Sequence, residues 1–420
     1  MSELQNLIES GKEAFDLTES ADRDSLSALT ERLLALPDLS LAVLKQAALA
    51  DDAPLEFKIA AKLVDSRRFM MANEKPLHIG VVFAMWGEHN RLRTKSADNP
   101  NGEDSLRVKL QQLDWVTSGT AVNWTLYAVD DGDPNDSGAM VADIAANHPL
   151  GDHVKVLHLA NAVPTDAGPL AALPSADDSR KGGAIVLGCM QAIEDGVDAV
   201  VYTDADNSVH LGQIGLLLRP FLQNGTRVVL GNRKHPEAVL VKQEGRWGIG
   251  IKALRHMQRM VGRAIFSRDI RDTQAAFKLY EATVLRQIIQ NPTVFDFSFD
   301  TDWILAAIAM EEPFVKVPFA FIDSAAESAS IAQGPMTTWE TLLKGLVQAV
   351  RKHGVSHNEA MARVLDEEIH SSADLDAIIN HLPPELESAS DADFGNPDVM
   401  SPEAMQTWIH ERRKAAGLLK

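Results

Sequence analysis

Four short apolar segments between residues 78 and 203 alternate with segments of helical pattern. The apolar segments are 78–84, 124–129, 154–159 and 199–203, and each is rich in aliphatic, β-branched or aromatic residues. Strands that alternate with helices in this way form right-handed βαβ units, which build a mostly parallel sheet. We therefore expect an α/β fold with a Rossmann-like central sheet, to which residues 227–230 and 314–319 add further strands.

Helical patterns flank this central part of the chain. Leucines recur every three or four residues between positions 26 and 36, and an amphipathic pattern covers 339–350. The sequence thus predicts a helical N-terminal extension at 1–75, a central domain at 76–335 and a helical C-terminal extension at 336–420. Neither extension carries clustered acid–base chemistry, so we expect roles in packing or assembly. Whether the chain forms a homo-oligomer through these extensions stays open.

Charge and composition exclude several classes of partner. The 420 residues carry a formal net charge of -19, whereas a nucleic-acid binder needs a basic surface. No apolar run approaches the roughly 20 residues of a membrane span, and the N-terminus lacks a signal-peptide pattern. We expect a cytoplasmic protein with a single core thiol, Cys189. Because Lys344, Arg351 and Lys352 accompany the amphipathic segment, a peripheral membrane contact stays open.

Two carboxylates follow the strand-like segment 199–203. Ligands of open α/β sheets collect at the carboxyl ends of strands, where Asp204 and Asp206 stand. Carboxylate oxygens are the ligands that Mg²⁺ and Mn²⁺ prefer, and such metals keep positions for substrate phosphates. The pattern predicts a metal–phosphate site, with a solvated turn as the alternative.

A second strand also ends in acids. Asp130 and Asp131 can accept hydrogen bonds from a nucleobase or ribose, or can build a turn with their side chains. Lys181 and Gly182 stand just before a helix, where a helix N-terminus and a cation favour phosphate. Two acid-tipped parallel strands together favour a nucleotide-plus-metal site.

Two further acid clusters lie later in the chain, at 271–274 and 299–303. Asp300 or Ser298 can cap a helix expected to start at Trp303. Asp302, in the first turn of that helix, is a candidate catalytic base.

These segments, taken in order, resemble family 2 glycosyltransferases of the GT-A fold, in particular the dolichyl-phosphate glucosyl- and mannosyltransferase branch. The resemblance covers residues 78–325. The parts that carry it are Glu88, 129–132, Lys181-Gly182, 204–206, 231–233, 272–279 and 299–302.

The resemblance implies a nucleotide-sugar donor, a UDP- or GDP-sugar, and a bound Mg²⁺ or Mn²⁺. Asp131, with Asp130, would hold the base. Asp204 would hold the ribose or the metal, and Asp206 the metal that bridges the diphosphate. Glu88, Lys181 and Arg233 would complete the donor site.

The resemblance also implies an inverting transfer in which Asp302 deprotonates the acceptor hydroxyl. The most similar branch usually has Glu at this position. Asp272, Gln274 and Asp300 would support the acceptor site. The acceptor itself stays open between a lipid phosphate, a saccharide and a small acid.

Three alternatives remain. One is a retaining GT-A transferase that makes a glycosylated small acid. Another is a sugar nucleotidyltransferase, which should have a Gly-rich phosphate loop after the first strand, where this chain has Ala-Met-Trp-Gly-Glu at 84–88. The last is a catalytically silent GT-A scaffold, against which the retention of the acidic positions argues.

Overall fold

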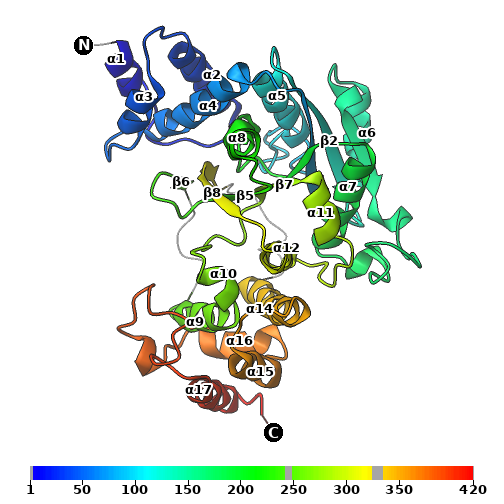
Figure 1. Ribbon diagram of the computed structural model, residues 1–420, viewed down its shortest axis with the longest axis vertical. Coiled ribbons are helices and arrows are strands. Elements are labelled where there is room, and N and C mark those ends of the chain that lie inside the picture. The colour runs from blue at the N-terminus through cyan, green and yellow to red at the C-terminus, as the bar shows by residue number, and fades with distance from the viewer. Residues whose placement is uncertain (1–2, 242–247, 324–333, 420) are drawn as a thin grey trace. The chain divides into compact units, whose positions relative to one another are not determined.

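The computed structural model describes residues 3–241, 248–323 and 334–419 (Figure 1). The chain forms two compact units. The first comprises Met1–Lys242, Ala275–Gln290 and Pro313–Ala326, and the second comprises Gln243–Gln274, Asn291–Glu312 and Glu327–Lys420. These boundaries differ from the division at residues 75 and 335, which follows sequence pattern rather than packing and stays a prediction.

Within the described residues, seven strands form the central sheet of the first unit, in the order β3-β2-β1-β4-β7-β5-β8. Their bounds are β1 Leu77–Met85, β2 Val122–Asp130, β3 Val154–His158, β4 Ala199–Thr203, β5 Val228–Asn232, β7 Phe277–Glu281 and β8 Phe314–Pro318. Strand β7 runs antiparallel to β4 and β5, while the other neighbours pair in parallel. The expected Rossmann-like, mostly parallel sheet is confirmed.

Strand β7 is absent from the sequence-based expectation. Lys278 is the second of its five residues and interrupts the apolar run that marks the other strands. The side chain is nevertheless fully buried, because its ammonium donates to the carbonyl of Ala275 and lies 5.4 Å from the ring centroid of Tyr202. A buried lysine is tolerated when it is hydrogen-bonded in this way.

Helices cover both faces of the sheet. They are α5 Ser105–Thr117, α6 Ser137–Ala146, α7 Gly182–Glu194, α8 Ile214–Asn224 and α11 Ala282–Ile288 (Figure 1). On one face, Val81 and Phe83 share a core with Leu110 of α5 and Leu217 of α8. On the other face α7 approaches β1 so closely that a Cβ at Gly188 would lie 2.4 Å from a methyl group of Val82.

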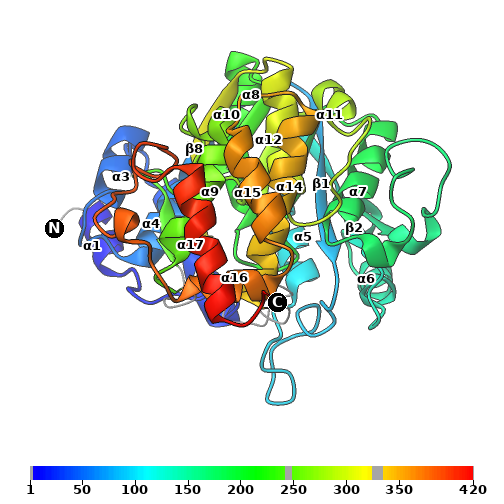
Figure 2. The ribbon, with the colours of Figure 1, turned by 90° about the horizontal axis from the view of Figure 1, so that it is seen from below.

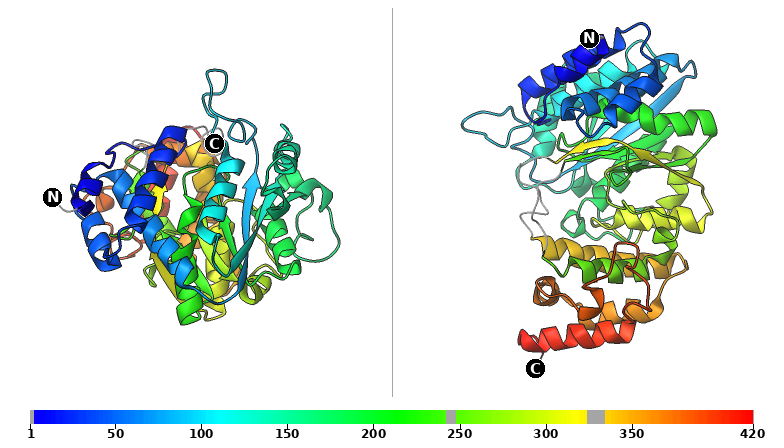
Figure 3. Two further views of the ribbon diagram at one scale, coloured as in Figure 1. Left: turned by 90° about the horizontal axis from the view of Figure 1, so that it is seen from above. Right: turned by 90° about the vertical axis from the view of Figure 1, so that its left-hand side faces the viewer.

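The N-terminal helices pack within the same unit as the sheet (Figure 3). They are α1 Glu3–Glu9, α2 Ser20–Leu34, α3 Leu41–Ala48 and α4 Leu55–Ala72. Their apolar core, with Leu33 and Phe57 fully buried, includes residues of a small two-stranded sheet, β6 Val239–Val241 and β9 Ala320–Ile322. Ser66 of α4 donates to the carbonyl of Gly212 at 2.6 Å and so ties α4 to the segment before α8.

The described residues of the second unit form helices (Figure 2). They are α9 Ile251–Val261, α10 Arg263–Phe266, α12 Phe299–Ala309, α14 Pro335–Lys352, α15 Glu359–Glu368, α16 Ser372–Ile379 and α17 Pro402–Ala415. Buried Arg413 of α17 joins three of them, because it pairs with Glu368 of α15 at 2.6 Å and with Asp374 of α16 at 2.8 Å.

The cations considered for a membrane contact lie on α14, and each has an acidic partner. Lys344 pairs with Glu340, Arg351 with Glu359, and Lys352 with Asp302. Among residues 3–241, 248–323 and 334–419, no helix combines the length and the apolar character that crossing a bilayer requires.

Candidate nucleotide and metal site

The acids predicted from the sequence follow neighbouring strands of the sheet. Strand β1 lies between β2 and β4, and its last residue, Met85, lies opposite Asp130. The amide of Asp131 donates to the carbonyl of Met85 at 2.9 Å. Because β1, β2 and β4 are parallel, Glu88, Asp130 and Asp204 all belong to the same edge of the sheet.

Asp131 presents an unused acceptor. Its Oδ2 accepts the amide of Lys181 at 2.7 Å, while Oδ1 is buried and receives no hydrogen bond of normal geometry from the described residues. Burial raises the pKa of this carboxyl to about 6, and the negative charge of Asp130 adds to that rise, although Ser179 and the Lys181 amide oppose it. A buried carboxylate oxygen without a donor is stabilised by a ligand N–H or O–H.

Asp130, in contrast, builds a turn. Its Oδ1 accepts the amides of Gly132 and Asp133, both at 2.9 Å, and its Oδ2 accepts the amide of Gly138 at 3.0 Å. These bonds hold the chain as it passes from β2 into α6 and satisfy both oxygens. That Asp130 also helps to hold the nucleobase stays a prediction.

Lys181 connects the ends of β2 and β4. Besides its amide bond to Asp131, its ammonium is paired with the carboxylate of Asp204. Its φ of 81° lies in the left-handed region, which is unusual for a side chain other than glycine and recurs at functional sites. Burial would raise the pKa of Asp204, but Lys181, with Arg233 and Lys109, holds it below its ordinary value.

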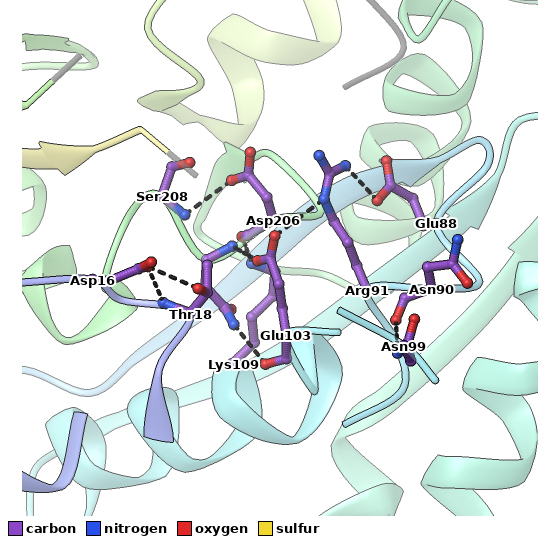
Figure 4. A network of polar contacts seen from close by, with 11 residues as sticks. Asp16, Thr18, Glu88, Asn90, Arg91, Asn99, Glu103, Lys109, Asp206 and Ser208 are labelled. Carbon is purple, nitrogen blue, oxygen red and sulfur yellow. Dashed lines mark hydrogen bonds and ion pairs between the residues drawn. The ribbon is translucent and has the colours of Figure 1, made fainter. Parts of the chain in front are cut away.

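Asp206 is half-buried beside a second lysine (Figure 4). The ammonium of Lys109, itself only 1% exposed, donates to the main-chain carbonyl of Asp206. The amide of Ser208 donates to Oδ1 of Asp206 at 3.0 Å. Burial lowers the pKa of Lys109, against the attraction of Asp206, Glu103 and other nearby acids.

A buried ion-pair network continues from Asp206 to the end of β1 (Figure 4). Arg91 donates through Nη1 to Glu88 at 2.7 Å and through Nε to Glu103 at 3.1 Å. Glu103 in turn accepts the amide of Asn207 at 2.8 Å. Burial raises the pKa of Glu88 to about 7, because Arg91 offsets only part of the lost hydration.

Four members of this neighbourhood were not predicted from the sequence: Arg91, Glu103, Lys109 and Asn207. Arg91 and Glu103 come from the polar loop between β1 and α5, Lys109 from within α5, and Asn207 from the loop after β4, where polar residues are ordinary. No spacing marks them, since only the fold brings them to the strand ends. Arg233, which was predicted, lies with its guanidinium 5.0 Å from the ring centroid of Phe321 and acts on Asp204 through its charge.

The carboxylates of Asp204 and Asp206 fit a metal that is bound together with phosphate. Among the residues that the structure describes, no group of three or more His, Cys, Asp or Glu side chains gathers as a metal site. Asp204 and Asp206 therefore offer two carboxylates at most. Mg²⁺ is commonly held by one or two carboxylates, with substrate phosphates and water as the other ligands.

The remaining predicted residues lie in the second unit: Asp272, Gln274, Asp300 and Asp302. Helix α12 begins at Phe299, four residues before the expected start. Ser298 is its N-cap residue but makes no side-chain capping bond, and Asp300 lies inside the first turn. The expectation that either side chain caps the helix is therefore wrong, because the chain turns into the helix earlier than its apolar pattern begins.

Asp302 is 1% exposed and has two basic residues as neighbours, Lys352 at the end of α14 and His353 directly after it. His353 Nε2 lies 2.7 Å from its Oδ1, and Lys352 Nζ lies 3.5 Å from its Oδ2. Neither partner was predicted, because both are fifty residues away in the sequence. Gln274 donates to the hydroxyl of Thr301 at 3.2 Å, beside Asp302 in the chain.

No family model matches this chain. A curated protein, the undecaprenyl-phosphate mannosyltransferase of Micrococcus luteus, is 25% identical to it over 199 residues, which are 47% of this chain and 72% of that protein. This chain is a relative of the glycosyltransferases. The resemblance to family 2 glycosyltransferases that the motifs predict is thereby confirmed.

Solved structures also resemble this relative of the glycosyltransferases. Glucosyl-3-phosphoglycerate synthase from Mycobacterium tuberculosis, solved with Mn²⁺, UDP and glucosyl-3-phosphoglycerate, has a TM-score of 0.43 and 13% identity, covering 76% of this chain and 86% of its own. Mannosyl-3-phosphoglycerate synthase from Rubrobacter xylanophilus has a TM-score of 0.44 and 13% identity, covering 75% and 85%. The expected fold class is confirmed by the sheet itself, which is mostly parallel and has helices on both faces.

Proposed function

We propose that this chain is a metal-dependent glycosyltransferase that moves a sugar from a nucleoside-diphosphate sugar to an acceptor hydroxyl or phosphate. The observation that carries the proposal is the link that Lys181 makes between Asp131, after β2, and Asp204, after β4. One residue thereby aligns a buried hydrogen-bond acceptor with a carboxylate suited to a metal.

The nucleoside would bind at Asp131. Its buried Oδ1 receives no hydrogen bond of normal geometry from the described residues, and uracil and guanine both carry a ring N–H that can supply one. A UDP- or GDP-sugar therefore suits the site. Lys181 and Arg233 add positive charge near Asp204, where a diphosphate would need it.

Asp204 and Asp206 would hold Mg²⁺ or Mn²⁺. When bound, the metal would neutralise the charge that develops on the departing nucleoside diphosphate. The ammonium of Lys181 is paired with the carboxylate of Asp204, so it would have to leave this carboxylate when a metal binds there. It could then contact the diphosphate. The buried network around Arg91 and Glu103 would keep the loop after β4 in place.

The proposal takes Asp302 as the general base of an inverting transfer. Its carboxylate contacts His353 and Lys352, and these two contacts would fix the direction in which it faces the acceptor hydroxyl. His353 would orient the carboxylate. The Micrococcus luteus relative is named for an undecaprenyl-phosphate acceptor, so a polyprenyl phosphate is the first acceptor to test, before saccharides and small acids.

Ligand-induced stabilisation of the full chain tests the donor part of the proposal. UDP- and GDP-sugars are screened with Mn²⁺ or with EDTA, because a ligand that binds only the folded protein raises its melting temperature. We expect one nucleotide to stabilise the wild type in Mn²⁺, and Asp131→Ala to abolish the shift. Asp143→Ala, an exposed acid on α6, is the matched control. The proposal fails if Asp131→Ala and Asp143→Ala respond alike.

A further inference from the structure

A cavity of about 290 Å³ lies in the first unit, and its walls include residues of α3, α4, α8 and β8. None of the residues that line it is a donor-site residue named above. Its volume is at the lower end of the range for small-molecule sites, and it corresponds to roughly ten water molecules at about 30 Å³ each. The cavity therefore has room for a small ligand.

One acid in the wall of this cavity already has two cationic partners. Asp65 is 4% exposed, and its carboxylate lies 2.7 Å from Lys45 Nζ and 2.5 Å from Arg219 Nη2. Arg219 also donates to the main-chain carbonyl of Asp65 at 3.1 Å. Two cations thus compensate a single buried carboxylate, which leaves an excess of positive charge.

Lys62 adds a third cation, one turn before Asp65 on α4. Nothing in the described part of the chain forms a hydrogen bond or ion pair with its ammonium; Glu237 and Asp65 act on it only through their charge. Burial lowers the pKa of Lys62, because the charged ammonium loses hydration there. The lining groups Lys45, Lys62 and Arg219, against Asp65 and Glu237, leave one net positive charge in a chain whose formal net charge is -19.

We propose that this cavity binds a small anionic molecule through a phosphate-monoester or carboxylate group. Lys62 would be its principal contact, with Lys45 and Arg219 beside it. Leu216, Val315 and Val317 form an apolar part of the lining, against which an uncharged remainder of the ligand would pack. The inference stands apart from the proposed transferase activity, since none of these residues belongs to the donor site.

Calorimetric titration of the full chain tests this site. The probes are inorganic phosphate, glycerol 1-phosphate and butyrate, each at constant ionic strength with chloride as the reference anion. We expect saturable binding of at least one probe. Binding of the two phosphates alone would assign a phosphate ligand, and binding of butyrate alone a carboxylate.

Three variants locate the bound anion. Lys62→Gln should weaken binding about 10-fold or more, because a charged hydrogen-bond donor is lost. Glu237→Gln should strengthen it several-fold, because an exposed negative charge at the cavity is removed. Lys58→Gln, on the same helix but outside the cavity, should bind as the wild type does.

The sign of the Glu237→Gln effect keeps the test decisive even if Lys62→Gln unfolds. The proposal is overturned if no probe binds saturably. It is equally overturned if Lys62→Gln, shown by circular dichroism to be folded, binds as tightly as Lys58→Gln, or if Glu237→Gln leaves the affinity unchanged.

Discussion

The ammonium of Lys181 is paired with the carboxylate of Asp204 at the carboxyl end of β4. The pair places the positive charge of Lys181 beside one of the two carboxylates that the proposed metal would use. The main-chain amide of the same lysine holds Asp131 at 2.7 Å, so a change of its side chain alone leaves the alignment of Asp131 in place. Metal binding and nucleoside binding can therefore be separated by mutation.

Lys181→Met should strengthen the binding of Mn²⁺ to the nucleotide-free protein. The substitution removes a cation that competes for Asp204, and it keeps most of the side-chain volume. Binding of the nucleoside diphosphate should weaken, because a charged donor to phosphate is lost. Electron paramagnetic resonance measures free Mn²⁺ directly. Weaker Mn²⁺ binding in this variant would show that Lys181 supports the metal site rather than competing with the metal.

Nucleotide-sugar binding should strengthen as the pH rises through about 6. The pKa of Asp131 is raised to about 6, and its ionised form accepts a stronger hydrogen bond from the base than its protonated form does. Below pH 6 the affinity should fall, by at most about 10-fold for each pH unit. A nucleotide sugar is the right ligand, because its diphosphate has no terminal group that titrates in this range. Calorimetry at pH 5, 6 and 7.5 measures the effect.

The same raised pKa affects folding with the opposite sign. The folded chain binds the proton of Asp131 more tightly than the unfolded chain, so this group's contribution to stability decreases as the pH rises from ~4 to about 6. Asp131→Asn should remove both pH effects. If Asp131→Asn retains the pH dependence of binding, another group is responsible. Glu88 is then the first candidate, because its pKa of about 7 lies within the pH range measured.

Arg91→Ala should destabilise the fold by about 3–5 kcal/mol, because it leaves two buried carboxylates, Glu88 and Glu103, without their shared cation. Urea unfolding of the full chain measures the loss. Arg93→Ala is the control, since Arg93 is exposed. This variant should lose no more than about 0.5 kcal/mol of unfolding free energy. An equal loss of unfolding free energy in Arg91→Ala and Arg93→Ala would mean that the network contributes nothing to stability.

Asp302→Asn should slow transfer about 10²-fold or more while donor affinity changes little, because the amide cannot accept the acceptor's proton. His353→Ala should slow transfer less, by loosening the carboxylate that it contacts at 2.7 Å. Asp300→Asn should cost mainly stability. Single-turnover kinetics with a saturating donor separate these outcomes. Transfer by Asp302→Asn at nearly the wild-type rate would place the base elsewhere or indicate a retaining mechanism.

The elements with regular patterning could be predicted from the sequence. Strand β4 was predicted with its observed bounds, 199–203, because a buried parallel strand is a continuous apolar run. The acids that follow β2 and β4 were predicted for the same reason, since the end of such a run shows where the sheet stops. Strand β7 was missed, because Lys278 is buried by contacts that only the folded chain provides.

The partners of the predicted residues could not be predicted. Arg91 and Glu103 pair across a loop whose composition suggests solvent exposure, and His353 approaches Asp302 from a helix fifty residues later. Such pairs depend on long-range packing rather than on local spacing. The role of Asp130 was ambiguous for a different reason: a turn-forming and a ligand-binding aspartate look the same in sequence, and three backbone bonds show the turn.

The dependence of nucleotide-sugar binding on a metal and on Asp206 tests the central claim most directly. Calorimetry of the full chain is run with the UDP- or GDP-sugar selected by screening, in Mn²⁺ and in EDTA, for the wild type and Asp206→Ala. We predict saturable binding by the wild type in Mn²⁺, and binding at least about 10-fold weaker both in EDTA and in Asp206→Ala. Equal affinity under all these conditions, or no saturable binding of any nucleotide sugar, would contradict the assignment of a metal-dependent donor site.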